Sequence, residues 1–318
     1  MNWSRSLTGR ERGRTCRPLP VIRYDAGLKA VIVEQRAIRV GTFFSHSLLD
    51  RFSGTFLGAA IASAFASSST SAPLPRGLGS QQTLLPADLY PDLLLQEWQT
   101  SSQYLIHRNL IHRTIPAEPL ERSPIVTLAA TLPLGLYKHD QPRQLDPEIQ
   151  SYLTHRDHLE LEPLAVVING AIGQILQNRH PLQDLYPRLE PYSATLPEHL
   201  FQMEQLITQE TTLAEMVEKF TPTDAENSLV LGFYCFLTTP TDFRLTLLRA
   251  GQTKSALAIF TAGVLAGVNN GWTGIPWHWS PPLMQPFQEL ATHLLARWAG
   301  VDAGMEPSEL PVSLPLPR

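Results

Sequence analysis

The sequence predicts an all-α protein built as a single compact multi-helix domain. Apolar residues recur at intervals of three and four in residues 104–111, 164–176 and 287–298, which is the spacing of an amphipathic or buried helix. Side chains that cap helices precede apolar runs elsewhere, and no sustained alternation of apolar and polar residues indicates strands. With 43% hydrophobic residues among 318, the chain is able to bury a large core.

Three parts of the chain differ in composition. Residues 1–45 form a basic arm with a short β-like run at 28–33, and we expect an accessory or unstructured extension there. Residues 46–300 carry the helical pattern and form the predicted domain. Residues 301–318 are rich in proline and should be extended or disordered.

The elements of the domain follow from local signals. A first helix is expected from about Ser47 to Ser67, and the Ser, Gly and Pro residues of 67–86 then predict a surface loop. The chain beyond this loop is almost entirely helical in pattern. Capping side chains at 221–226 and 239–242 mark two helix starts, and Pro286 marks the start of the last helix.

Cysteine content and the length of apolar runs exclude two classes of protein. Cys16 and Cys235 are isolated, so neither a disulfide framework nor a thiolate metal site is expected, and Cys235 should pack in the core. The longest apolar runs, 55–66 and 256–268, are shorter than the roughly 20 residues that cross a bilayer. We therefore expect no membrane partner.

The basic arm leaves an alternative open. Residues 1–40 hold nine Lys and Arg against three acidic residues, a pattern that also occurs in nucleic-acid-binding arms. An unstructured extension is the more common explanation for such a terminus, so nucleic acid is not the expected partner. The arm lacks the continuous apolar stretch of a secretory signal, and the expected location is cytoplasmic.

Two apolar segments with glycines four residues apart lie near opposite ends of the domain. Gly54 and Gly58 belong to residues 51–64, and Gly263 and Gly267 belong to residues 262–276. Glycines at this spacing share one helical face, where missing side chains let another helix approach closely. The pattern predicts tight helix packing.

Five segments, taken in order, resemble motifs of the ADP-ribosylglycohydrolase family. They are 51–64, 127–136, 153–157, 226–243 and 262–279. The resemblance implies the all-α fold of that family, a binuclear magnesium site and hydrolysis of an N- or O-glycosidic ADP-ribosyl bond. It also places residues 153–157 at the start of a long apolar helix, and it places Ala130 where the family has an arginine.

The chain departs from the family where the resemblance places the metal-binding aspartates. Serine stands at the first such position, and serines again replace the aspartates of the second motif, while glutamine and lysine replace those of the third. The corresponding residues are Ser63, then Thr100, Ser101 and Ser102, then Gln252, Thr253, Lys254 and Ser255. These eight residues are the candidates for contacting a ligand.

The departures change the expected chemistry. Two divalent ions need several carboxylates to offset their charge, and Lys254 brings a positive charge instead. We therefore expect no metal cofactor and assign no catalytic residue. The leading hypothesis is a metal-free pseudoenzyme that binds an ADP-ribosyl group, a related nucleotide or a protein partner. The alternative is an active glycohydrolase that releases ADP-ribose from a protein or small-molecule conjugate.

Other constellations receive simpler explanations. His155 and His158, followed by Glu160 and Glu162, have a spacing that permits zinc binding, whereas the family resemblance makes His155 and Asp157 helix-start residues. No glycine-rich phosphate loop opens a helix.

Aromatic and acidic side chains are explained by packing, solvation and capping. The rings of Trp272, Trp277 and Trp279 have the chemistry to stack on adenine, although packing is the favoured role. The acids expected on polar helix faces or at helix starts are Glu210, Glu215, Asp224 and Glu226.

Overall fold

The computed structural model describes residues 46–69, 91–106, 123–276, 279 and 284–301. Within these residues the secondary structure is helical and no strand is present, which confirms the all-α prediction. The α-helices are α1 (Leu48–Ser69), α2 (Pro91–Ile106), α3 (Pro124–Ala130), α4 (Leu132–Tyr137), α5 (Pro142–Thr154), α6 (Glu162–Leu176), α7 (Tyr186–Leu189), α8 (Leu196–Thr208), α9 (Leu213–Lys219), α10 (Ala225–Thr238), α11 (Phe243–Gln252), α12 (Ala256–Asn270) and α13 (Met284–Trp298). A short 3-10 turn, η2 (Leu159–Leu161), precedes α6.

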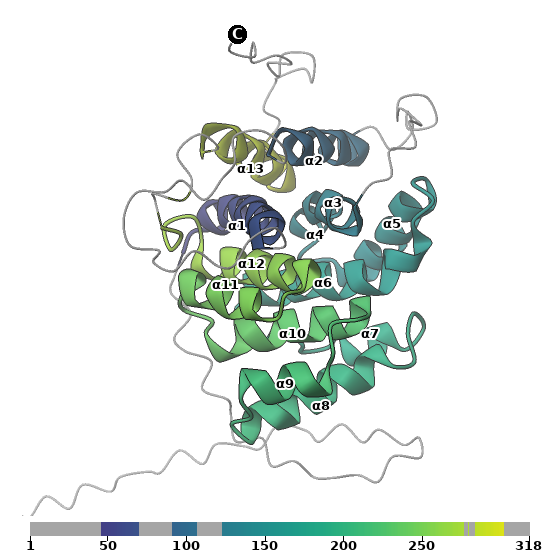
Figure 1. Cartoon of the computed structure of the whole chain (residues 1–318). Helices are drawn as coiled ribbons and strands as arrows, with labels where there is room; N and C mark the ends of the chain where they lie inside the picture. Colours follow the sequence, from purple (N-terminus) through teal and green to yellow (C-terminus); the bar gives the residue numbers. More distant parts are fainter. Residues whose placement is uncertain (1–45, 70–90, 107–122, 277–278, 280–283, 302–318) are drawn as a thin grey trace, which may run out of the picture. The chain divides into compact units, whose positions relative to one another are not determined.

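Helices α1 and α12 form the centre of the packing. They lie side by side, and α12 also contacts α6, α10 and α11, whereas α13 packs on α1 (Figure 1). Helix α2 packs on α3 and α4, and helix α8 packs on α10. The two helices that carry the paired glycines are thus those around which the others assemble.

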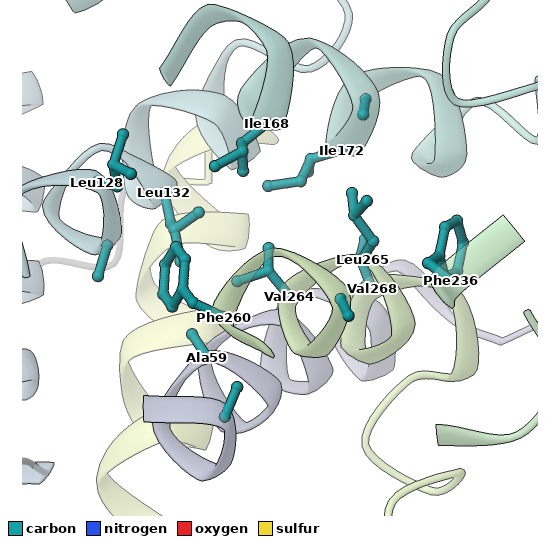
Figure 2. Packing of buried hydrophobic residues seen from close by; sticks show 14 of the residues in the cluster. Ala59, Leu128, Leu132, Ile168, Ile172, Phe236, Phe260, Val264, Leu265 and Val268 are labelled. Atoms are coloured by element: carbon teal, nitrogen blue, oxygen red, sulfur yellow. The ribbon is translucent and has the colours of Figure 1, made fainter. Parts of the chain in front are cut away.

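The core joins side chains from all the α-helices that the structure describes. Figure 2 shows Ile168 and Ile172 of α6 facing Val264 and Leu265 of α12, with side chains of α1, α3, α4 and α10 around them. These four residues are at most 1% exposed. Removing such aliphatic side chains from water contributes roughly 25 cal/mol for each square ångström buried.

Caps set several helix starts at the predicted positions. Asp224 accepts a hydrogen bond from the backbone nitrogen of Asn227 at 2.7 Å, and Asp242 accepts one from that of Leu245 at 2.9 Å. Ser47 does the same for Asp50 at 3.1 Å, directly before α1. Each side chain satisfies a backbone N–H that has no partner inside the helix.

The expected first helix is confirmed to within two residues, since α1 spans Leu48–Ser69. One local prediction is wrong. Residues 153–157 do not start a helix: α5 ends at Thr154, and Asp157 has a left-handed backbone with φ of 59° that does not continue a helix. The β-like run at 28–33, most of the 67–86 loop and the 302–318 tail lie outside the described residues.

One described stretch passes the length test for a membrane span. Residues Leu159–Leu176 have a mean hydropathy of 1.4 over 18 residues, and 83% of this stretch is buried inside the protein. Burial of this extent is typical of a core helix that other helices surround.

Candidate functional site

The glycines of α1 and α12 bring the two helices into backbone contact. A Cβ atom added at Gly58 would lie 2.5 Å from the carbonyl oxygen of Gly263, and one at Gly267 would overlap the carbonyl oxygen of Gly54. Since the early glycine of α1 meets the late glycine of α12, the helices run antiparallel. The end of α1 therefore lies beside the start of α12.

Ser63 lies on this central helix but serves its backbone. The residue is 3% exposed, and its hydroxyl donates to the carbonyl oxygen of Ala59 at 2.8 Å. Its neighbour Ala62 meets the face of Gly263. Ser63 is thus a buried packing residue near the end of α1, on the side where α12 begins.

The candidate residues of α2 make similar bonds. Thr100 donates to the carbonyl oxygen of Gln96 at 2.8 Å, and the fully buried Ser101 donates to that of Glu97 at 3.0 Å. The hydroxyl of Ser102 is buried and makes no hydrogen bond. Of the three, only Ser102 keeps its hydroxyl available.

The third group comprises Gln252, the last residue of α11, and the three residues that connect α11 to α12. Thr253 donates to the carbonyl oxygen of Ala250 at 2.6 Å, and Ser255 caps α12 by accepting from the backbone nitrogen of Ala258 at 3.2 Å. Gln252 and Lys254 are exposed. Lys254 has a left-handed backbone with φ of 57°, which turns the chain between the two helices.

The structure brings part of the predicted site together. Ser63 and Ser255 lie toward the same end of the α1–α12 pair because the helices are antiparallel. Helix α2 is fixed through Trp98, whose ring lies 4.9 Å from that of Phe56 of α1 and 5.3 Å from that of Phe287 of α13. Residues 100–102 lie on α2, which packs on α3, α4 and α13.

The structure contains a buried ion pair that the sequence does not predict. Glu97 of α2 and Arg156, which follows α5, lie 3.1 Å apart with side chains 6% and 10% exposed. Arg156 also lies over the ring of Tyr152 at 5.3 Å. The only signal in the sequence is a carboxylate one turn before Ser101, and nothing local identifies its partner 59 positions later.

The zinc alternative finds no support among the described residues. His155 Nδ1 lies 2.5 Å from the carbonyl oxygen of Ser151, and His158 pairs with Glu160 at 3.1 Å. Nowhere in the described ranges do three His, Cys, Asp or Glu side chains gather closely enough to hold a metal ion.

The remaining acids and aromatics have structural roles where they are described. Glu215 completes a capping box with Thr212, and Glu226 accepts hydrogen bonds from Ser193 and Thr195. Glu210 was expected on a polar helix face or at a helix start, but it lies after the end of α8 and has a left-handed backbone with φ of 57°.

Trp272 and Trp279, which follow α12, make structural contacts. Trp279 is 2% exposed and packs edge-on against Phe243 at 6.2 Å. The backbone nitrogen of Trp272 donates to the carbonyl oxygen of Asp50 at 2.9 Å. Trp277 lies outside the described residues. Packing is therefore confirmed for Trp279.

Cys235 is a packing residue, as predicted. It is fully buried in α10, and this burial raises the pKa of its thiol to about 12. Because the thiolate is the reactive form, we expect no labelling of Cys235 by a thiol reagent at pH 8 until the protein unfolds. Labelling of a Cys16→Ser variant, with and without denaturant, checks this, and fast labelling of the folded variant would contradict it.

Comparisons with known proteins do not place the chain in a family. It matches no protein-family model, and no curated protein matches it either.

Proposed function

We propose that this protein is a metal-free relative of the ADP-ribosylglycohydrolases that binds an ADP-ribosyl or related nucleotide group without hydrolysing it. The observation that carries the proposal is the chemistry of the positions where the resemblance expects aspartates. Ser63, Ser101, Ser102 and Gln252 are uncharged, and Lys254 is cationic. Two magnesium ions in such a setting would lack the negative charge that offsets them.

The bonding of these side chains supports the same proposal. The hydroxyls of Ser63, Ser101 and Thr253 all donate to carbonyl oxygens of their own helices. These hydroxyls are neutral, so they supply neither the negative charge that two divalent ions need nor a base that activates water. Hydrolysis by the mechanism of the family would need groups that these positions do not supply.

Two exposed residues, Gln252 at the end of α11 and Lys254 just after it, give the proposed ligand its point of contact. Lys254 precedes α12 by two residues in the chain, so its positive charge adds to the partial positive charge of that helix N-terminus. A diphosphate carries negative charge that both would attract. Gln252, also exposed, offers an amide for hydrogen bonds.

Calorimetric titration of ADP-ribose into the full chain, once with magnesium and once with a chelator, tests the proposal. We expect binding that is equal in both conditions, with no ADP-ribose released from an ADP-ribosylated protein. Binding that requires magnesium would contradict the metal-free assignment. Release of ADP-ribose would favour the glycohydrolase, and absence of binding in both conditions would favour a protein partner.

Lys254 variants locate the contact. Lys254→Gln should weaken ADP-ribose binding about fivefold, the effect of losing roughly 1 kcal/mol from one exposed charge interaction. Lys254→Gly should weaken ADP-ribose binding to a similar extent, although glycine adopts the left-handed backbone without strain. The pair of variants thus distinguishes the effect of the lost charge from an effect of the backbone conformation. Lys219→Gln, at an exposed lysine of α9, is the matched control and should bind like the unmodified protein.

A further inference from the structure

The chain contains two Asn-Gly pairs, Asn169-Gly170 and Asn270-Gly271. Such a pair is a common signal for a tight turn. The structure places both on helices instead, since Asn169 and Gly170 lie inside α6 and Asn270 is the last residue of α12. The two asparagines are 0% and 4% exposed. Both pairs therefore belong to the core.

The same bonding pattern holds both side-chain amides in place. Each Nδ2 donates to the carbonyl oxygen of the residue four positions earlier in its helix, at 2.9 Å for Asn169 and 2.8 Å for Asn270. Outside its helix, Asn169 also donates to Oγ1 of Thr131 at 2.7 Å. Asn270 also donates to the carbonyl oxygen of Pro240 at 2.9 Å. Both N–H groups of each amide thus have an acceptor.

In an unfolded chain, an Asn-Gly pair is open to deamidation. The backbone nitrogen of glycine attacks Cγ of the asparagine and gives up its proton to a base in the solvent. As the new N–Cγ bond forms, the Cγ–Nδ2 bond breaks, and Nδ2 takes up a proton and leaves as ammonia. Water then opens the cyclic imide at one of its two carbonyls, which yields aspartate or isoaspartate. Glycine favours the attack because it has no Cβ to obstruct its nitrogen.

The folded protein holds both pairs back from this reaction. The attack requires Cγ to turn toward the next backbone nitrogen, and that turn breaks the hydrogen bonds of the amide. At buried positions, the abandoned acceptors would have no water to replace the lost donor. We therefore expect cyclisation only after the helices have opened.

The product at position 169 does not fit the folded protein. An aspartate has no N–H to donate, and its carboxylate would lie beside the acceptors that Asn169 leaves. One of them, Thr131, already donates its hydroxyl hydrogen to the carbonyl oxygen of Leu128 at 2.7 Å. The other is the carbonyl oxygen of Ala165. A buried charge without a donor is strongly destabilising.

The product at position 270 meets the same obstacle. Its carboxylate would face the carbonyl oxygen of Pro240, which also accepts from Nδ2 of Asn269 at 2.8 Å. The site lies at the C-terminal end of α12, where the helix dipole disfavours an anion. Isoaspartate would in addition lengthen the backbone next to Gly271, whose own backbone packs on Gly54 of α1. Neither product is compatible with the folded structure.

We propose that Asn169-Gly170 and Asn270-Gly271 are deamidation sites of the unfolded chain, and that a chain modified at either site does not refold. Unfolding then becomes irreversible at the rate at which the pairs cyclise. The fold protects the residues on which it depends, and a molecule that stays unfolded loses the ability to return. This property does not depend on the proposed function.

Time spent in denaturant tests the proposal. The full chain is held in guanidinium chloride and a thiol reductant at pH 8 for increasing times and then diluted, and size-exclusion chromatography separates refolded protein from aggregate. We expect the refolded yield to fall with time. Mass spectrometry of peptides should find the modified residues in the aggregate and not in the refolded protein. Equal modification of the two fractions would overturn the proposal, as would intact asparagines in both.

Two conditions separate deamidation from ordinary aggregation. Protein kept folded at pH 8 for the same times should retain both asparagines, and modification as fast as in denaturant would contradict the proposed protection. Because the glycine nitrogen must lose its proton, cyclisation slows as the pH falls. Incubation in denaturant at pH 6 should therefore preserve the refolded yield, and an equal loss at pH 6 and pH 8 would overturn the proposal.

Variants that carry the product from the start give a second test. Asn169→Asp and Asn270→Asp should each lose the refolded yield that the unmodified protein shows after brief denaturation. Asn178→Asp, at an exposed asparagine that follows α6, is the matched control and should refold like the unmodified protein. Normal refolding of either core variant would overturn the proposal for that site.

Discussion

Replacing Trp98 with alanine should cost about 4 to 5 kcal/mol of unfolding free energy, close to the whole stability of a marginal domain. The ring is fully buried between Phe56 of α1 and Phe287 of α13. Its Nε1 donates to the carbonyl oxygen of Ala129 at 2.7 Å. The substitution leaves a large cavity and an unsatisfied carbonyl. Urea denaturation followed by circular dichroism measures the loss.

Trp98→Phe separates the two contributions. Phenylalanine keeps an aromatic ring between the neighbouring helices but has no N–H, so the expected loss is about 1 to 3 kcal/mol, largely from the orphaned carbonyl of Ala129. If alanine and phenylalanine cost the same, the ring contacts of α2 with α1 and α13 contribute little, and the described packing would be wrong.

Gly267→Ala should lower the unfolding free energy by about 3 kcal/mol, although alanine favours an unconstrained helix by about 1 kcal/mol. The added methyl group would overlap the backbone of Gly54, and a backbone cannot rotate away as a side chain does. The helices must separate, which opens contacts along the whole α1–α12 interface. Thermal and urea denaturation measure the effect.

Gly170→Ala is the matched control on α6. The methyl group there would meet Cδ2 of Leu185 and the guanidinium of Arg188, which are the ends of flexible side chains. We expect a smaller loss than at Gly267, about 1 to 2 kcal/mol, because buried side chains such as Leu185 shift at a lower cost than a backbone does. Equal losses for Gly170→Ala and Gly267→Ala would show that the glycine face is not a special contact.

Local signals were sufficient to predict where many helices begin. Asp224 and Asp242 cap the helices that follow them, since a short acceptor beside free backbone N–H groups acts within one turn of chain. The start predicted at 153–157 failed for the opposite reason. Asp157 adopts a left-handed backbone conformation in the folded protein, and the sequence motif does not indicate this.

Contacts between distant residues were much harder to predict. The glycine spacing indicated a close helix approach, but a repeat of four residues does not say which helix approaches. The same holds for Glu97 with Arg156, and for His180 with Glu204, where each side chain reads as an ordinary polar residue in its own segment. The helical fold does not establish the function that the family resemblance implies, because binding depends on the chemistry of the candidate side chains. That function stays a proposal.

The antiparallel contact of α1 with α12 has a consequence for synthesis in the cell. Thr273, just beyond α12, bonds Asp50 at the start of α1 across 223 positions of sequence. At about 5 to 20 residues per second, a ribosome needs roughly 10 to 45 seconds to make that length of chain. During this interval the apolar, glycine-bearing face of α1 has no native partner. Helix α1 therefore presents this apolar face without its main native partner until α12 has been synthesised.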